Sequence, residues 1–302
     1  MIYNANIIVP TLCPLQFKDI QNASELTHYP QAFQYVQKFG ISKTIHVQFH
    51  FTSDPTAGAV TINVFNYHTD APICIGGTAK TYTASVTTLS AGHYYMDYYI
   101  PCSELSGVVY FTVTSSQGLM LTSWPVEIGN TGDMIEITYF NTDNDFQTVF
   151  GNPAPVFQES NLFSVYVEGG FRPDGYTPSG NAESFSNQFA EPSLTYGMPF
   201  DVERLTLGDS NGLPRWMGQK LNAIFHCDTV LIDGFQWSRN SPLTVEYTGK
   251  LTGVYSIDLV PSTNRLTQTI AGDILITNEE STVITTEAEI ALALSKTTDP
   301  WP

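Results

Sequence analysis

Two histidines of one predicted strand are the first residues in this sequence that could do chemistry. His46 and His50 alternate with the apolar residues of segment 43–51, so both should lie on the polar face of a half-buried strand. Four positions along a strand span about 13 Å, which is too far for two ligands of one zinc ion. His68 or His93 could complete a site only if the fold placed one of them nearby. We therefore predict a polar outer sheet face and no metal site.

Two short acidic segments resemble fragments of calcium-binding loops. Residues 143–145 read Asp-Asn-Asp, and residues 209–212 read Asp-Ser-Asn-Gly. Neither has the remaining oxygen ligands or the bidentate glutamate of an EF-hand. Because Asp, Asn, Ser and Gly also favour tight turns, the sequence predicts turns at both places.

Paired carboxylates are the next candidates for catalysis. Glu279 with Glu280, or Glu287 with Glu289, would suit a glycosidase only if the two groups faced each other across a cleft. The chain has 29 acidic residues, so adjacent pairs are expected without any function. The sequence also lacks a Gly-x-Ser-x-Gly elbow, a phosphate loop and a dinucleotide fingerprint. We predict a protein that is not an enzyme and has no catalytic residues and no cofactor.

The cysteines are expected to be unpaired buried thiols. No Cys-x-x-Cys motif is present to indicate zinc or redox chemistry. Cys227 directly follows His226, but neighbours on a strand point to opposite faces, which argues against a catalytic dyad. The four cysteines are widely spaced: Cys13, Cys74, Cys102 and Cys227.

The charge balance limits the classes of partner. The chain has 12 lysines and arginines against 29 aspartates and glutamates, giving a formal net charge of -17. Phosphate backbones are bound by clustered cations, so we expect no sequence-specific nucleic-acid binding. An acidic surface suits a soluble protein, or the wall of a passage through which DNA slides without sticking.

No segment is predicted to cross a membrane or to direct export. Residues 1–17 lack a basic region, and no apolar run approaches the roughly 18 residues of a membrane helix. Aromatic residues make up 13% of the chain and charged residues only 14%, a composition typical of exported or particle-bound β proteins. Assembly of a particle in a host cytoplasm would reconcile this composition with the missing signal, as would a signal that has been removed.

Short apolar segments separated by turn residues dominate residues 1–130. Segments 60–67, 108–114 and 119–124 follow the strand at 43–51, with turn residues between them and no helical pattern. This spacing predicts an antiparallel β-sandwich of the immunoglobulin-like type.

Residues 131–302 are predicted to form an α+β, strand-rich domain with one clear helix. The small polar residues 129–132 mark the boundary between the two domains. Pro214 can open a helix, which is expected at about 214–225. The apolar residues after it recur at helical spacing: Met217, Leu221, Ile224 and Phe225.

Two segments of this second domain lack a clear strand pattern. Residues 172–191 are rich in Gly, Pro, Ser and Asn and contain few aliphatic residues, so they are expected to form a long loop. Residues 286–302 carry a modest helical stripe and a polar end, and should form a C-terminal arm that docks on a neighbour or frays.

Tyrosines on one predicted strand suggest a binding surface. Tyr94, Tyr95, Tyr98 and Tyr99 populate both faces of the strand, so some of them must lie outside the core. Exposed aromatic side chains favour protein contacts or stacking on sugars, and the sequence leaves both open. In a carbohydrate-binding or adhesin module, Tyr98 and Trp237 would be candidate stacking residues.

Several motifs resemble those of virion proteins from tailed phages of Bacteroidota, including crAss-like phages. The similar segments are residues 123–129, 137–146, 165–171, 205–208, 212–216 and 232–234. The resemblance implies a tail or neck-ring component that is copied around the particle axis, and it brings no functional residues with it.

The resulting hypothesis is a non-enzymatic structural protein of a phage tail or portal-proximal ring, located in a virion assembled in the host cytoplasm. Its partners would be copies of itself in a cyclic homo-oligomer and neighbouring virion proteins. The ring would surround a DNA passage along the particle axis. The alternative is the carbohydrate-binding or adhesin module of a virion or cell surface. A glycoside hydrolase comes third.

Overall fold

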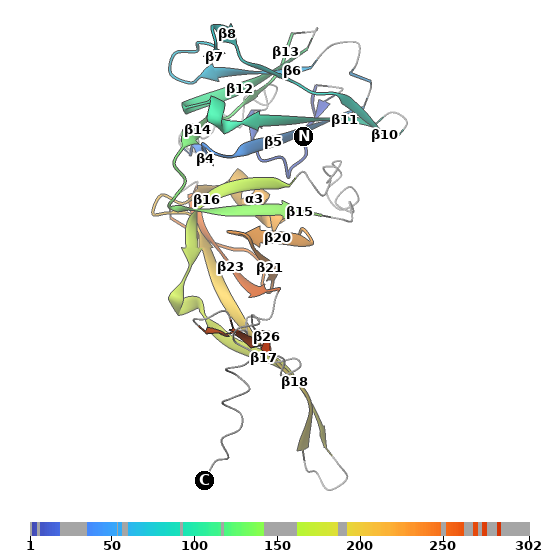
Figure 1. Cartoon of the computed structure of the whole chain (residues 1–302), viewed down its shortest axis with the longest axis vertical. Helices are drawn as coiled ribbons and strands as arrows, with labels where there is room; N and C mark the ends of the chain where they lie inside the picture. Colours follow the sequence, from blue (N-terminus) through green and yellow to red (C-terminus); the bar gives the residue numbers. More distant parts are fainter. Residues whose placement is uncertain are drawn as a thin grey trace. The chain divides into compact units, whose positions relative to one another are not determined.

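The computed structural model describes most of the chain between residues 2 and 284 as a mainly β protein (Figure 1). The chain divides into two compact units, Met1–Tyr176 with Glu203–Val260, and Thr177–Val202 with Pro261–Pro302. The described residues are 2–4, 7–18, 35–52, 54–55, 60–90, 93–115, 118–141, 162–186, 192–248, 252–262, 268–270, 274–276 and 283–284.

The N-terminal part of the first unit contains two sheets. The five-stranded sheet has the order β1-β2-β5-β11-β10, and the other has the order β3-β13-β12-β14-β4, with β6 and β9 attached through β12. The pairs are antiparallel except for β14 with β4. The strands are β1 (Ile2–Asn4), β2 (Ile7–Ile8), β3 (Phe17–Lys18), β4 (Gln37–Gly40), β5 (Thr44–Phe51), β6 (Thr61–Asn66), β9 (Thr81–Thr83), β10 (Val86–Ser90), β11 (His93–Pro101), β12 (Gly107–Ser115), β13 (Gly118–Ser123) and β14 (Val126–Gly129), with the small hairpin β7 (Cys74–Ile75) and β8 (Thr78–Ala79) and the 3-10 turn η3 (Cys102–Glu104).

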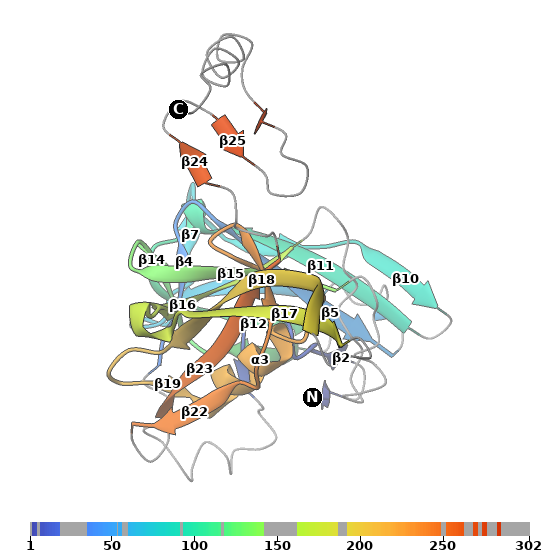
Figure 2. The ribbon, with the colours of Figure 1, turned by 90° about the horizontal axis from the view of Figure 1, so that it is seen from below.

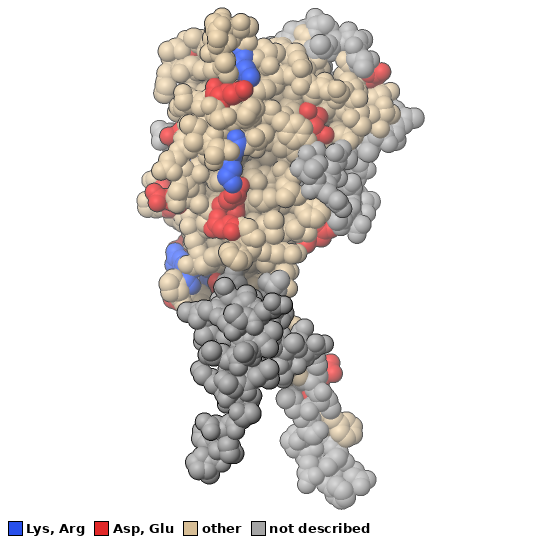
Figure 3. Space-filling view, viewed as in Figure 1, with Lys and Arg blue, Asp and Glu red and all other residues tan. Residues whose placement is uncertain are grey.

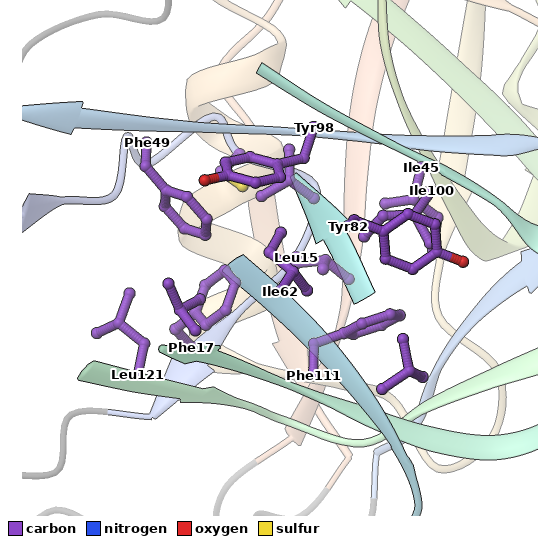
Figure 4. Packing of buried hydrophobic residues seen from close by; sticks show 14 of the residues in the cluster. Leu15, Phe17, Ile45, Phe49, Ile62, Tyr82, Tyr98, Ile100, Phe111 and Leu121 are labelled. Atoms are coloured by element: carbon purple, nitrogen blue, oxygen red, sulfur yellow. The ribbon is translucent and has the colours of Figure 1, made fainter. Parts of the chain in front are cut away.

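Side chains from both sheets meet in a first core, because apolar residues alternate along the strands. Phe17 and Phe49 contact each other edge to face, with 5.4 Å between ring centroids, and Phe49 contacts Tyr98 at 5.6 Å (Figure 4). The Tyr98 hydroxyl donates a hydrogen bond to the Val60 carbonyl oxygen at 3.0 Å. The predicted sandwich of alternating strands is therefore present at the level of layers and core.

A second sheet system follows with the order β17-β18-β16-β15-β20-β21-β23-β19. β22 pairs with β23, and β18 also pairs with β23. The elements are β15 (Met134–Phe140), β16 (Phe163–Phe171), η4 (Pro173–Gly175), β17 (Thr177–Ser186), β18 (Pro192–Leu207), β19 (Leu213–Pro214), β20 (Thr229–Ile232), β21 (Phe235–Arg239), β22 (Thr244–Tyr247) and β23 (Thr252–Pro261).

One helix, α3 (Arg215–Ile224), packs with apolar side chains of this sheet in a second hydrophobic core. Pro214 is its N-cap. Met217, Leu221 and Ile224 are buried, whereas Gln219 is exposed. The mainly β character is confirmed, and the helix predicted at about 214–225 is present as the one α-helix of the described residues.

The predicted long loop at residues 172–191 is wrong for residues 172–186, and residues 187–191 lie outside the described part of the chain. Here β17 pairs antiparallel with β18, and η4 precedes it. The described side chains of β17 are all exposed, so the strand has no buried face that would require aliphatic residues. The alternation that identifies half-buried strands is therefore missing from its sequence.

The second unit also contains a three-stranded sheet of β24 (Gln268–Ile270), β25 (Ile274–Ile276) and β26 (Val283–Ile284). The predicted C-terminal arm at 286–302 lies outside the described residues. The predicted boundary at 129–132 lies between β14 and β15, and the first compact unit contains residues from both sides of it. The division into 1–130 and 131–302 stays a prediction.

Gly218 allows α3 to approach β23 closely. A Cβ atom added to Gly218 would lie 2.1 Å from Cζ of the buried Tyr255. Helix propensity alone would favour alanine by about 1 kcal/mol, but overpacking a core costs about 1–3 kcal/mol. We expect Gly218→Ala to lower the free energy of unfolding in urea, whereas Gln219→Ala on the exposed side should change it by less than about 0.5 kcal/mol. A stabilised Gly218→Ala variant would contradict this close packing.

Candidate functional site

Three consecutive backbone carbonyl groups near the N-terminus are bound by side chains of the second core. The Tyr139 hydroxyl on β15 donates to the Leu12 carbonyl oxygen at 2.5 Å. Lys220 Nζ on α3 donates to the carbonyl oxygens of Cys13 at 2.6 Å and Pro14 at 2.8 Å. Leu12 packs in the second core and Cys13 in the first. This short segment therefore joins the two cores.

Lys220 is the central residue of this junction, with 2% of its surface exposed. Burial lowers the pKa of its amine to about 8, because the charged form loses its hydration. Its Nζ also lies 5.7 Å from the ring centroid of Trp216. The sequence carried a signal for this residue, because Lys220 follows Met217 by three positions and so falls on the apolar stripe of the helix.

The polar residues of β5 are buried, so the predicted exposed sheet face is wrong. His46, Gln48 and His50 have only 4%, 0% and 4% of their surface exposed. The second core covers them: the ring of Phe163 on β16 stacks on the His46 imidazole, with 4.3 Å between centroids and an interplanar angle of 2°. A strand that is covered on both sides lacks the solvent face that alternation normally indicates.

A continuous chain of hydrogen bonds joins these buried polar groups, and His46 Nδ1 is left without a hydrogen-bond partner. Asp97 Oδ1 on β11 accepts from His46 Nε2 at 2.7 Å and from Gln48 Nε2 at 2.8 Å. Gln48 Oε1 accepts from His50 Nε2 at 2.7 Å. The strand register places Asp97 opposite Gln48, which brings these groups together. Burial lowers the pKa of His50 to about 4, so this imidazole is neutral at pH 7.

The geometry of this chain suits structure rather than catalysis. The His46 ring lies between Phe163 and Tyr99, the latter at 4.7 Å between centroids. Both ring faces are therefore covered by aromatic side chains, which leaves no space there for a substrate. Among the residues that the structure describes, no group of three or more His, Cys, Asp or Glu side chains could hold a metal ion.

The other candidate residues from the sequence do not come together. His68 and His93 are exposed. The predicted turn at 209–212 is confirmed, because Asp209 Oδ1 accepts from the Asn211 backbone N–H at 2.8 Å. The acidic groups at 143–145, 279–280, 287 and 289 lie outside the described residues.

All four cysteines have free thiols, as predicted, but the prediction that they are buried is wrong for Cys74, which is exposed on the small hairpin of β7 and β8. Burial raises the pKa of the Cys227 thiol to about 12, which makes it a poor nucleophile at neutral pH. The neighbouring His226 is exposed and contacts the guanidinium of Arg239.

Charged side chains on the surface form isolated pairs. Lys43 contacts Glu136 at 2.8 Å and Lys38 contacts Glu168 at 3.6 Å, and both pairs join a residue before the predicted boundary at 129–132 to one after it. Figure 3 shows such adjacent basic and acidic groups on a face that is otherwise mostly uncharged. Partly exposed pairs of this kind contribute about 0–1 kcal/mol each, so the buried contacts matter more for the junction.

The two candidate sugar-stacking residues are buried, which corrects their assignment. Tyr98 lies in the first core, and the Trp237 ring stacks on Phe171 with 4.5 Å between centroids. Aromatic character alone could not distinguish core from surface. Large apolar side chains are instead exposed at Ile41, Tyr67, Ile75, Tyr99, Leu162, Tyr176, Phe185, Met198, Phe235, Val245 and Tyr247.

Two of these exposed residues lie on β22, next to β23 at one edge of the sheet (Figure 2). All four β22 side chains are exposed, and 68% of the Tyr247 surface is accessible. Proline and lysine commonly prevent an edge strand from pairing with another strand, and β22 contains neither.

The β17–β18 ribbon is the other exposed candidate surface. Its register runs from Thr177 opposite Val202 to Ser186 opposite Pro192, with an irregularity next to Glu183. Among the described strands, β17 pairs only with β18. The compact unit that contains this ribbon also contains residues 261–302.

Comparisons with known proteins identify no relative. No family model matches the chain, and no curated protein matches it. In the part that the structure describes, no helix is long and apolar enough to cross a membrane.

The junction can be tested by removing the Lys220 amine. Lys220→Met leaves the Cys13 and Pro14 carbonyl groups buried without their donor, which costs about 1–3 kcal/mol. We expect the free energy of unfolding in urea to fall by this amount, and Gln219→Met on the same helix to leave it nearly unchanged. Unchanged stability of Lys220→Met would mean that relief of the buried charge offsets the lost hydrogen bonds.

The buried polar chain predicts a dependence of stability on pH. Folded His50 has a pKa of about 4, whereas an unfolded histidine titrates near 6.5. Between these values the unfolded chain binds more protons, so stability is full above pH 6.5 and is lost as the pH falls toward 4. His50 alone should cost about 2 kcal/mol between pH 7 and pH 5.

The contribution of His50 to the free energy of unfolding can be measured by urea unfolding at pH 7 and pH 5. Three proteins are compared: the wild type, His50→Gln and His68→Gln. We expect the loss of stability on acidification to be about 2 kcal/mol smaller in His50→Gln. The exposed His68→Gln control should follow the wild type. Equal losses in all three proteins would exclude a buried neutral His50.

Proposed function

We propose that this protein is a non-enzymatic structural subunit of a phage particle, a tail or portal-proximal ring protein that assembles in multiple copies around the particle axis. The observation that carries the proposal is the β17–β18 ribbon, whose described β17 side chains are all exposed. A subunit built for contact with neighbours explains a strand, β17, whose described side chains belong to neither hydrophobic core. The virion assignment rests on the sequence motifs that resemble Bacteroidota phage proteins.

The arrangement of the remaining chain is consistent with a rigid subunit. Lys220 and Tyr139 bind the segment that joins the two cores, and this coupling would hold the surfaces of the first unit in a fixed geometry. We also propose an immunoglobulin-like arrangement for residues 1–130, supported by the antiparallel pairing of β5 with β11 and of β12 with β6.

The charge of the chain also supports a position near packaged DNA. A net charge of -17 would repel phosphates, so DNA could move along an acidic passage without binding to it. Neighbouring virion proteins and other copies of the chain would then contact the uncharged surfaces. The protein would reside in the virion.

The alternative, a carbohydrate-binding or adhesin module, is supported by the exposed edge strand β22. Tyr247 presents an aromatic ring there, with Val245 exposed on the same strand, and aromatic rings can stack on sugar rings. Glycan binding that Tyr247→Ala abolishes without unfolding the protein would favour this alternative.

The first experiment on the proposed function is the native mass of the purified chain by light scattering, with negative-stain imaging of the same fraction. We expect a concentration-dependent oligomer with cyclic symmetry, because a head-to-tail contact closes into a ring. Addition of salt should favour assembly, since the acidic subunits repel each other. A chain that stays monomeric at millimolar concentration and with neighbouring particle proteins would contradict the proposal.

A further inference from the structure

The edge strand β22 has one paired side and one open side. Among the described strands it pairs only with β23, from Thr244 opposite Ser256 to Tyr247 opposite Gly253. All four of its side chains are exposed. An open edge presents a row of backbone donors and acceptors that a further strand can bind.

The hydrogen bonds to β23 determine which backbone groups of β22 face outward. Just after the strand, the Thr248 N–H donates to the Thr252 carbonyl oxygen at 3.2 Å. In an antiparallel pair, hydrogen-bonded and non-hydrogen-bonded positions alternate, so the backbone of Glu246 also points at β23. The N–H and carbonyl groups of Val245 and Tyr247 therefore point away from β23. A further antiparallel strand would satisfy all four groups.

The side chains of the same two residues extend the apolar face of the sheet beyond the second core. Val245 lies opposite Tyr255, which is buried next to Gly218 of α3. Residues opposite each other on paired strands share a face, so Val245 and Tyr247 lie on the face that α3 covers at Tyr255. Yet 39% of the Val245 surface and 68% of the Tyr247 surface are exposed. This face therefore continues past the helix without a cover.

The sequence of β22 matches itself in an antiparallel pairing about Val245. When Val245 lies opposite Val245 of a second copy, Thr244 lies opposite Glu246 and Tyr247 lies opposite Leu243. The apolar residues of both copies then form one row on one face, where such cross-strand pairs stabilise a sheet. On the other face the Thr244 hydroxyl can donate to the Glu246 carboxylate of the second copy.

Other registers of the same two strands are less favourable. Pairing about Glu246 places two carboxylates directly opposite each other, which destabilises a sheet. In the pairing about Val245 these residues are diagonal neighbours instead, about 7–8 Å apart. Val245 opposite Glu246 makes no hydrogen bonds, because the backbone of Glu246 points at β23. A pairing about Tyr247 extends past the end of β22.

We propose that two copies of the chain pair through β22, antiparallel about a two-fold axis at Val245, so that one sheet runs through both copies. The two Val245 residues exchange both of their backbone hydrogen bonds. The contact is isologous, because each copy uses the same surface. It goes beyond the proposed ring, whose head-to-tail contact joins two different surfaces, and in combination with such a ring it would join two rings.

Disulfide formation tests this pairing in a Cys74→Ser background, which removes the exposed native thiol. Val245→Cys places one thiol of each copy at the axis. Opposed Cα atoms of a hydrogen-bonded pair lie about 5.5 Å apart, within the range of a disulfide. On mild oxidation we expect about tenfold more disulfide-linked dimer from Val245→Cys than from Glu246→Cys or Tyr247→Cys, whose thiols lie farther from their copies.

The three cysteine variants also define the results that would overturn the pairing. Dimer from Glu246→Cys or Tyr247→Cys, without dimer from Val245→Cys, would show that the strands do not pair about Val245. No dimer from any of the three, in proteins with the circular dichroism of the wild type, would show that copies do not meet through β22.

A lysine at the axis provides a second test, because lysine prevents edge strands from pairing. We expect Val245→Lys to raise the dissociation constant of the dimer, measured by light scattering over a concentration series, by about tenfold or more, since two like charges face each other. Ile75→Lys places the same charge on another exposed β-branched residue and should assemble as the wild type does. Melting temperatures confirm that both variants are folded.

The outcomes of this second test separate the β22 contact from the proposed function. Assembly of Val245→Lys that equals that of the wild type would overturn the β22 contact and leave the proposed ring intact. A wild type that forms only dimers, which Val245→Lys dissociates, would support the β22 contact and count against the ring. A wild type that is monomeric at every concentration would overturn both.

Discussion

The binding of buried backbone carbonyls by Lys220 is the interaction on which the rest of the first unit depends. Its Nζ donates to Cys13 and Pro14 from a helix of the other core. Burying a charged amine costs free energy, and so does burying a carbonyl oxygen without a hydrogen-bond donor. The Lys220 amine and the carbonyl groups therefore stabilise each other. This mutual requirement fixes the N-terminal segment to α3 and sets how the two cores meet.

The same junction explains why β5 is buried on both sides. Phe163 covers the His46 ring, and Asp97 accepts hydrogen bonds from His46 and Gln48. Buried polar networks favour one arrangement over others, because a shifted register would leave several groups unpaired. The cores are thus matched by hydrogen bonds as well as by apolar contact.

We expect the function to depend on the surfaces that the two cores hold in place. The His46 ring is covered on both faces by aromatic side chains, which leaves no space there for a substrate, and the exposed large apolar residues include two on β22 and two on the β17–β18 ribbon.

The sequence by itself determined the local elements that depend on spacing. Alternation identified β5 and β12, and Pro214 with the stripe from Met217 identified α3, because period and turn chemistry are local properties. Only the tertiary structure decided which face of each strand is buried. It buried His46, Tyr98 and Trp237. It also formed β17 from a segment without strand alternation. Which side of a strand is covered depends on residues far away in the chain, and no local pattern contains that information.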